Sequence, residues 1–563
     1  MPEYLSPGVY VEEVDRGPKP IQGVGTATAV FVGYTEKAQM AERVDGEYVT
    51  RDLLNRPQLV TNWRQYVERF GGFVDGAYLP QAVYGYFQNG GTRCYVLSLK
   101  TIPKAQAALL NAEGKPQLIV RAKQAGFDGL RLRVRVEGVA TPAASAEAKK
   151  EKGDKEDAAA AATANHNFTI VVEREKLTGG WNAQETLKDV SLAETDEGGT
   201  KRVNVAFKDN KASKLIDIVV PEGAPLAKLW PRDQQQSLNI EAKQLTPPTA
   251  QDFQGDVTER TGVEGLEAID DITMVCAPDL MTTAPGQKLD LNTVKAVQTM
   301  MIAHCERLGD RMALLDAPPG MSPQQVQKWR MDVAGYDSSY AALYYPWLEV
   351  NDPATNRPAN IPASGHVAGI WARNDATRGV HKAPANEVVR GATGLAYNTT
   401  RGEQDILNPI GVNCIRSLPG MGIRVWGARS LASNSTWRYI NVRRLFNYVE
   451  KSIELGTQWV VFEPNDPSLW GQVLRDTNAF LTNVWRTGAL FGTSPDQAYY
   501  VKCDEELNPP ESRDAGRLVI EIGLAPVKPA EFVIFRISQW AGGAEGGGEG
   551  GGGGEEGGGE GEG

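Results

Sequence analysis

The sequence predicts a multi-domain α/β protein with a doubly wound core sheet, an inserted β-rich domain and a C-terminal α+β domain. First, short apolar runs alternate with amphipathic helical segments on both sides of the chain's middle, the pattern of a sheet covered by helices on both faces. Second, the middle is polar and its short segments alternate apolar and polar residues, as strands with one solvated face do. Third, 563 residues with 41% hydrophobic side chains suffice for several separate cores.

These changes of pattern place the predicted domain boundaries. We expect an N-terminal arm and linker (1–25), the first part of the α/β core (26–100), a surface-exposed inserted β-rich domain (101–262), the rest of the core (263–430), a C-terminal domain ending in a terminal strand arm (431–540), and a disordered Gly/Glu tail (541–563). The tail holds six Glu and no basic residue, and such a sequence cannot form a packed core.

The elements of the core follow in order along the chain. Buried strands are expected at 28–34 (TAVFVGY), 272–278, 311–320 and 339–350, and helices at 62–72, 79–88, 291–309 and 322–335. A strand at 94–99 follows the Asn-Gly turn after the second helix. Strands that alternate with helices in this way predict a largely parallel sheet.

The inserted and C-terminal regions have their own patterns. In the insertion, LRLRVRVEGV at 130–139 alternates Leu and Val with Arg, which predicts a half-buried strand. The charged, Ala-rich run at 146–165 fits an exposed helix or a flexible loop, and its composition favours the loop. In the C-terminal region, a helix at 439–456 is followed by a strand within TQWVVFEPND (457–466), and a helix at 468–490 precedes strands at 498–503, 516–527 and 530–538.

No pattern in the sequence predicts catalysis, a metal or a cofactor. The four histidines, His166, His304, His366 and His381, form no HExxH and no His–carboxylate cluster, and the P-loop pattern is absent. Ser364 lies two residues from His366, a spacing that rarely lets two side chains meet as nucleophile and base. Asp279 follows a predicted strand, where α/β proteins bind ligands, but it has no identifiable partner. We therefore expect no enzyme, with hydrolase-like chemistry on the α/β core as the alternative.

Composition also limits the partners. The net charge of −11 argues against nucleic-acid binding. No apolar run reaches the length of a membrane span, and the opening MPEYLSPG has neither the basic nor the apolar part of a secretory signal. Five cysteines without metal or redox spacing predict reduced thiols and a cytoplasmic origin.

Both ends of the chain read as strands without a nearby partner. The N-terminal segment is Val9, Tyr10, Val11, Glu12, Glu13 and Val14, and the C-terminal segment is Phe532, Val533, Ile534, Phe535, Arg536 and Ile537. Because an unpaired strand leaves backbone groups without hydrogen bonds, each end should fold back on its own domain, pair with the other end, or add to a sheet of a neighbouring copy. The third outcome is a heterologous contact, which propagates into a ring, filament or net.

Several segments resemble one protein family. The opening YLSPGVYVEEVDRGPKPIQGVGTATAVFVG, the central PASGHVAGIWARNDATRGVHKAPANE (362–387), and the C-terminal RYINVRRLFNYVEKSIELGTQWVVFEPND and PAEFVIFRISQ are similar, in that order, to contractile tail sheath proteins. No motif of the family covers residues 100–263, and the Gly/Glu tail also departs from it.

The resemblance implies a subtilisin-like core without working catalysis, and a structural role. It implies hexameric rings stacked in a helical lattice around an inner tube, a C-terminal sheet completed by strands from neighbouring subunits, and contraction that drives the tube through a target envelope. The implied partners are other copies, the inner tube protein, and baseplate and terminal cap proteins. The particle would be assembled in the bacterial cytoplasm, as a phage tail or a phage tail-like injection system; a non-contracting shell protein is the remaining alternative.

One predicted helix is a candidate for contact with the inner tube. Between residues 441 and 455 it carries Arg443, Arg444 and Lys451, which could form breakable ion pairs with acidic tube residues. A solvated helix face opposite an apolar side fits the same residues equally well.

Overall fold

The computed structural model of the protein describes residues 20–536, apart from 45–46, 140–166, 177, 198–199, 208–211, 222–225, 247–248, 354 and 356. The predicted N-terminal arm strand, Ile537, His166 and the Gly/Glu tail lie outside the described residues. Contacts divide the chain after Lys528 into two units, which are described separately. No helix within the described ranges has the length and hydropathy needed to cross a bilayer.

The first unit is built on a nine-stranded sheet. Its strands, in spatial order, are β19 (Glu387–Val388), β22 (Gly422–Val425), β21 (Val412–Leu418), β16 (Ala341–Tyr345), β15 (Met312–Asp316), β14 (Met274–Cys276), β1 (Ala29–Thr35), β5 (Cys94–Thr101) and β4 (Gln58–Val60). The six strands from β21 to β5 are parallel, and the outer ones pair antiparallel. The predicted α/β core with a large parallel sheet is thus confirmed.

Both faces of this sheet are buried. Every residue of β1 is buried, and alternate side chains enter different clusters: Val30 and Val32 lie on one face, Ala29 and Phe31 on the other. Strands covered on both faces carry continuous apolar runs, which is why these short segments were recognisable in the sequence.

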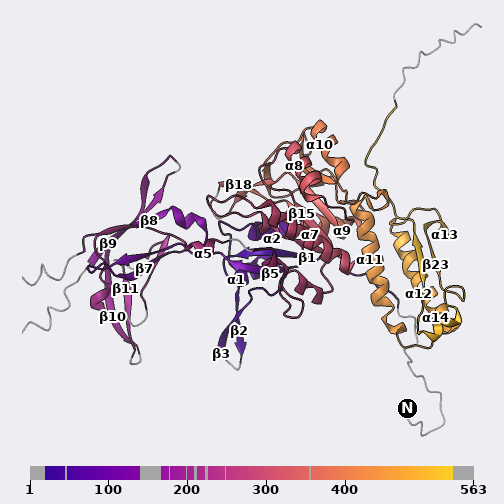
Figure 1. Ribbon diagram of the computed structural model, residues 1–563, viewed down its shortest axis with the longest axis horizontal. Helices are drawn as coiled ribbons and strands as arrows, with labels where there is room; N and C mark the ends of the chain where they lie inside the picture. The colour runs from indigo at the N-terminus through magenta and orange to yellow at the C-terminus, as the bar shows by residue number, and fades with distance from the viewer. Residues whose placement is uncertain are drawn as a thin grey trace, which may run out of the picture. The chain divides into compact units, whose positions relative to one another are not determined.

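Helices supply the cover on each face (Figure 1). One cluster includes side chains of α1 (Trp63–Phe70), α2 (Leu79–Gln88) and α9 (Ser364–Arg378), and the other includes those of α7 (Leu291–Leu308), α8 (Pro323–Lys328) and α10 (Arg401–Leu407). Ser322 and Gln325 form a capping box at the start of α8, as Thr400 and Glu403 do for α10. A π-helix, η6 (Trp329–Ala334), continues from α8.

Smaller sheets adjoin the core. They are the antiparallel β18 (Arg357–Ile361), β17 (Leu348–Asp352) and β20 (Ala392–Leu395), and the hairpin β2 (Gln39–Val44) and β3 (Glu47–Asp52). The strand predicted at 339–350 is in fact two strands, β16 and β17, separated at the cis bond Tyr345–Pro346.

Residues 106–245 form two further sheets around a separate apolar cluster. One contains β11 (Thr200–Ala206), β10 (Trp181–Glu197), β9 (Asn167–Glu175), β8 (Leu132–Glu137) and β13 (Gln234–Ser237), and the other contains β12 (Ile216–Val219), β7 (Pro116–Ala122) and β6 (Gln106–Leu110). The short helices here are α4 (Leu226–Leu229) and α5 (Ala242–Leu245), and α6 (Ala250–Gln254) follows. Leu132, Val134 and Val136 are buried in β8, as its alternation predicts.

The rest of the first unit is helical with one small sheet. Residues 457–466, predicted to contain a strand, instead contain the 3-10 helix η9 (Gln458–Val460). The region consists of α11 (Ile440–Gly456), α12 (Pro467–Arg486), α13 (Pro495–Ala498) and α14 (Pro510–Asp514), with the antiparallel pair β23 (Tyr499–Lys502) and β24 (Glu521–Leu524). In the described part of the chain neither strand of this pair has a second strand neighbour.

The second unit is described from Pro529 to Arg536 and has no regular secondary structure there. Four consecutive large apolar side chains, Phe532 to Phe535, are 71–83% exposed. Within the described residues, Phe532 to Arg536 of the predicted terminal strand therefore form no strand pair.

Candidate functional site: the arm junction

The chain entering β1 is fixed against the C-terminal helices, at a place we call the arm junction (residues 21–28 with α9, α11 and α12). Ile21 is buried in a cluster with Leu445 of α11 and Phe480 of α12. A Cβ on Gly23 would lie 2.1 Å from the Tyr448 hydroxyl oxygen, so a larger residue would require the Tyr448 side chain to shift. The N–H of Val24 donates to Ser452 Oγ at 3.2 Å. The predicted linker thus ends in a pinned segment.

A buried ion pair holds the junction together. Arg444 donates from Nη1 and Nη2 to Asp375 Oδ1 and Oδ2 of α9, at 2.8 and 2.5 Å, and the two side chains are only 4% and 5% exposed. Arg444 also donates to the carbonyl of Thr26 at 2.9 Å, and Thr26 Oγ1 donates to Asp375 at 2.6 Å. The guanidinium stacks 4.6 Å from the Trp371 ring centre. Three segments far apart in sequence are therefore joined by one bidentate, fully paired charge cluster.

Arg443 is also internal. It is 5% exposed, donates to Asn447 Oδ1 at 2.7 Å, and pairs with Glu450 at 3.0 Å. Its guanidinium lies 4.7 Å from the ring centre of Tyr340 and 4.4 Å from that of Trp437. The expectation that Arg443 and Arg444 face an inner tube is corrected here, because α11 is covered on more than one side and both charges are neutralised inside the subunit.

Lys451 is nearer the surface. Its side chain is 16% exposed and its Nζ lies 3.8 Å from Asp270, 3.8 Å from Asp310 and 3.3 Å from Glu454. It lines a small mixed-charge cavity of about 130 Å³ together with Arg93 and Asp271. Of the three cations predicted on this helix, Lys451 alone stays a candidate for tube contact.

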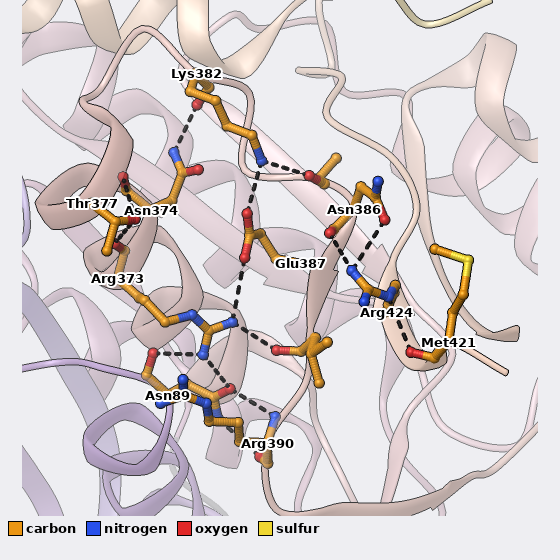
Figure 2. Close-up of polar contacts among 12 residues, drawn as sticks. Asn89, Arg373, Asn374, Thr377, Lys382, Asn386, Glu387, Arg390, Met421 and Arg424 are labelled. Carbon is orange, nitrogen blue, oxygen red and sulfur yellow. Dashed lines mark hydrogen bonds and ion pairs between the residues drawn. The ribbon is translucent and has the colours of Figure 1, made fainter.

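The loop after α9 forms a polar network (Figure 2). Arg373 of α9 donates to the carbonyls of Asn89 and Val388, at 3.0 and 2.7 Å. Lys382 Nζ donates to Glu387 Oε1 at 2.9 Å, and Asn374 donates to the Lys382 carbonyl at 2.7 Å. These bonds fold the segment that resembled the central family motif back onto α9 and toward the edge strand β19.

The same loop is connected to the segment around Val527, at the end of the first unit, which we call the C-terminal root. Asn441 Nδ2 at the start of α11 donates to the carbonyl of His381 at 2.8 Å and to that of Val527 at 3.2 Å. Val527 N–H donates to the Ala489 carbonyl at 3.2 Å. Segments near both ends of the first unit's described residues, Val24 to Thr26 and Val527, are therefore tied to α11.

The β23–β24 pair offers an incomplete sheet beside this root. Tyr499, Val501, Ile522 and Leu524 share one face and pack in the cluster of α11 and α12. On the opposite face Tyr500 is half-exposed and its hydroxyl donates to Glu521 at 2.7 Å. Two strands alone are a marginal sheet, and among the described residues neither outer edge has a neighbouring strand.

The crevice where an α/β enzyme would bind a ligand is filled. Chain order reverses between β1 and β14, and Asp279, just after β14, accepts hydrogen bonds from the N–H groups of Tyr34, Tyr78 and Leu79 and from Thr282 Oγ1. A Cβ on Gly33 would lie 2.3 Å from the Asp279 carboxylate. Burial raises the pKa of Asp279 to about 6 even with these donors. This aspartate closes the strand ends and caps α2.

The other residues weighed for catalysis form no constellation among the described residues. Ser364 Oγ and His366 Nδ1 are buried without a hydrogen-bond partner, and burial lowers the pKa of His366 to about 4. Asp316 accepts the Ser364 N–H at 2.9 Å. His304 and Cys305 are buried in α7, and burial raises the pKa of the Cys305 thiol. No group of His, Cys, Asp or Glu within the described ranges is arranged to hold a metal ion.

Comparison with known families matches the second half of the chain. Residues 261–431 match the phage tail sheath protein central domain, and residues 432–539 match the phage tail sheath C-terminal domain. A putative prophage major tail sheath protein of Pseudomonas aeruginosa (strain UCBPP-PA14) is 27% identical over 316 residues, which cover 54% of this chain and 77% of that protein. The tail sheath protein of Burkholderia phage BcepMu is 27% identical over 380 residues, which cover 65% of this chain and 75% of the relative.

Solved structures extend the likeness of fold to nearly the whole chain. The sheath of an extracellular contractile injection system, PVC, in its contracted state is similar with a TM-score of 0.55 and 20% identity, covering 96% of this chain and 99% of that one. The helical sheath of the anti-feeding prophage (AFP) in its contracted state gives 0.53 and 22% identity, with 95% and 100% coverage. From the matched domains and relatives, the chain is a member of the phage tail sheath family, a structural protein and not an enzyme.

Proposed function

We propose that this chain assembles as hexameric rings, stacked in a helical lattice around an inner tube, and that the lattice contracts to drive the tube through a target envelope. Membership of the tail sheath family supports the proposal, as does the likeness of fold to the contracted PVC and AFP sheaths. The subtilisin-like character of the core and the domain boundaries remain part of the same proposal.

The observation that carries it is the exposed C-terminal arm. Phe532, Val533, Ile534 and Phe535 present four large apolar side chains to solvent, with no strand partner in the described subunit. Single exposed apolar residues are common, but four in succession on an unpaired segment indicate a surface that another chain covers. Strand addition would satisfy both the backbone groups and the alternate side chains.

The acceptor in this proposal is the β23–β24 sheet of a neighbouring copy. Its apolar face already packs on the helices, and both outer edges lack a strand in the described residues. The C-terminal strand, Phe532 to Ile537, would take one edge. The N-terminal strand, Val9 to Val14, would take the other, so each subunit would hold its neighbours by two strands.

The arm junction fits a lattice that moves without coming apart. The roots of both arms are fixed to α11 through Arg444, Asn441 and Ser452. With rigid roots, a rotation of the body would be taken up in the Pro- and Gly-containing stretches between root and strand, DRGPKP and APVKPA. A difference of a few kcal/mol per subunit between two lattices, summed over many copies, would make contraction one-way.

The remaining partners belong to the same proposal. The inner tube protein would meet the inner surface of the lattice, with Lys451 as the candidate contact, and baseplate and terminal cap proteins would close its ends. The particle would be a phage tail or a tail-like injection system assembled in the bacterial cytoplasm, without nucleic-acid binding or membrane insertion by this subunit.

The test is electron microscopy of the purified full chain beside two arm variants. Wild-type protein should form long hollow tubes, and Phe532→Asp with Ile534→Asp should remain as subunits or short rings, because two carboxylates cannot enter an apolar sheet face. The matched control, Phe532→Tyr with Ile534→Val, keeps strand-forming side chains and should form tubes. Long tubes from the Asp variant would contradict strand donation.

Two further outcomes separate the alternatives. Deletion of Pro2 to Val14 should also prevent long tubes, and normal tubes would remove the N-terminal arm from the proposal. Tubes that show one lattice under every condition would favour a non-contracting shell.

A further inference from the structure

A groove on the core, outside the arm junction, carries more positive charge than its own residues neutralise. It has a volume of about 520 Å³ and lies between η6 and the segments 409–411 and 429–438. Three arginines line it, Arg330, Arg429 and Arg438, against one acidic residue, Asp337. We call it the arginine groove.

Arg330 is buried without a full set of partners. The residue is 6% exposed, and Nη2 donates to the Tyr336 carbonyl at 2.6 Å. Its Nε is buried and has no hydrogen-bond partner among the described residues. Burial lowers the pKa of this guanidinium. A buried donor on a cation is costly when unpaired, so this side chain is prepared for an acceptor that the described residues do not supply.

The other charges leave the groove cationic. The half-buried side chain of Arg438 has no hydrogen bond or ion pair within the described ranges. Arg429 forms the wall and donates to the Asn408 carbonyl at 3.3 Å. Asp337 accepts from the Ser433 N–H and Oγ, at 2.8 and 2.6 Å. Guanidinium groups with free donors are suited to carboxylates, which they can hold in a bidentate geometry.

The chain itself contains a matching anion. Residues 541–563 hold Glu545, Glu549, Glu555, Glu556, Glu560 and Glu562 and no basic residue. Gly-rich chains of 23 residues typically span about 24–29 Å, so carboxylates separated by glycines can reach into a groove one or two at a time. No described element and no part of the proposed function uses this charge.

We propose that the arginine groove binds the glutamates of the Gly/Glu segment 541–563 of a second copy of this chain. The binding is electrostatic: one or two carboxylates contact Arg330 and Arg438, and glycines keep the rest of the segment clear of the walls. Such contacts exchange quickly and weaken with salt.

The test is photo-crosslinking within the full chain, with benzoylphenylalanine in place of Gly552 and peptide mapping by mass spectrometry. Crosslinks should concentrate on the peptides that contain 329–338 and 429–438. Raising NaCl from about 50 to about 500 mM should reduce them about fivefold, because the Debye length shortens.

Two variants make the result specific. Arg438→Glu should reduce these crosslinks about fivefold or more, equivalent to one ion pair of about 1 kcal/mol. Replacing all six glutamates of the segment by Gln should have the same effect without touching the folded body. The matched control is Arg475→Glu, an exposed arginine of α12, which should leave them unchanged.

A charge exchange between the groove and the segment is the most specific test. Changing the six glutamates to Lys in the Arg438→Glu protein should restore part of the crosslinking to 429–438. Crosslinks that are spread over the surface, or that Arg438→Glu does not reduce, would overturn the proposal.

Discussion

The nine-stranded sheet and the β23–β24 pair are two sheets of one chain with opposite degrees of completion. In the large sheet, Phe31 of β1 is fully buried and packs against Tyr86 with ring centres 5.5 Å apart. After the small sheet, the chain continues in sequence to an arm on which Phe535 is 83% exposed. The two aromatic residues belong to similar apolar runs, VFV and VIF, yet among the described residues only Phe31 is buried.

The difference separates folding from assembly. The large sheet is covered by helices on both faces, and its two edge strands, β19 and β4, are very short. The small sheet has one covered face and two edges without strands among the described residues. Burial of apolar side chains in the core should therefore stabilise the single subunit against unfolding. Burial of the arm's apolar side chains should stabilise only the assembled polymer.

The largest expected effect comes from exchanging aromatic residues for Ala in these two places. Phe31→Ala should lower the free energy of unfolding by about 3–5 kcal/mol, through lost burial and a cavity in the core. Phe535→Ala should change it by less than about 0.5 kcal/mol but should shorten or abolish tubes. Both free energies are measured by denaturation in the non-assembling Phe532→Asp, Ile534→Asp background.

Equal destabilisation by both changes would break the comparison. It would mean that the C-terminal arm packs on its own subunit. Phe535→Tyr serves as the control, since it retains the ring and should keep tube length.

The second effect concerns the buried Arg444–Asp375 ion pair at the arm junction, which we call the clamp. Arg444→Met leaves the Asp375 carboxylate buried without its cation, and should cost about 3–5 kcal/mol. The double variant Arg444→Met, Asp375→Leu should recover much of this loss, because neither charge is then left alone. Thermal denaturation of the three proteins provides the measurement.

A matched exposed pair calibrates the clamp. Arg307 pairs with Glu264 and Glu267 at the surface, and Arg307→Met should leave the melting temperature almost unchanged. If Arg444→Met behaved like Arg307→Met, the clamp would not hold the junction.

The core could be predicted because strands that are buried on both faces consist of continuous apolar residues. The runs around Val30 and Leu314 are continuous and apolar, and helices with clear caps separate them. The division of β16 from β17, which the interpretation missed, was marked by Pro346, since proline cannot donate to a ladder. In β8, Arg133 does not simply face solvent: it pairs with Glu173 at 2.5 Å and stacks on Trp181 at 4.2 Å.

The arm junction could not be predicted in the same way. Thr26 and Asp375 are 349 positions apart, and Asp375 and Arg444 are 69 apart, so no local spacing indicates their contact. A helical pattern shows which residues share a face of α11, but not that Trp371 and Trp437 cover its arginines. The family motif around Asp375 was the available signal, and it marked a region without giving a partner.

The third effect is a pH dependence inside the core, where two buried groups act in opposite directions. Burial raises the pKa of Asp316 from 3.8 to about 6, so the folded state binds an extra proton between these pH values. The protonated side chain therefore contributes to the free energy of unfolding below pH 3.8, and this contribution is lost as pH rises through 6. Burial lowers the pKa of His366 from 6.5 to about 4, so its contribution is present above 6.5 and is lost as pH falls toward 4.

Removing either group should therefore tilt the stability profile. From pH 6.5 to 4, Asp316→Asn should lose on the order of 2–3 kcal/mol more than wild type, and His366→Asn should lose less by a similar amount. Denaturation at a series of pH values in the non-assembling background measures both slopes. Parallel profiles for all three proteins would show that neither group titrates in the core.

The smallest expected effect is at Lys451, whose side chain is more exposed than Arg444 and less exposed than the residues of the C-terminal arm. Its partners Asp270 and Glu454 are largely in water, so Lys451→Gln should lower the free energy of unfolding by less than about 1 kcal/mol, and Lys451→Arg by less still. If Lys451 meets the inner tube, the Gln variant should bind purified tubes more weakly in co-sedimentation while its subunit stability stays near wild type. Unchanged tube binding would remove the last cation of α11 from the tube surface, and a stability loss above about 2 kcal/mol would instead group Lys451 with the Arg444 clamp.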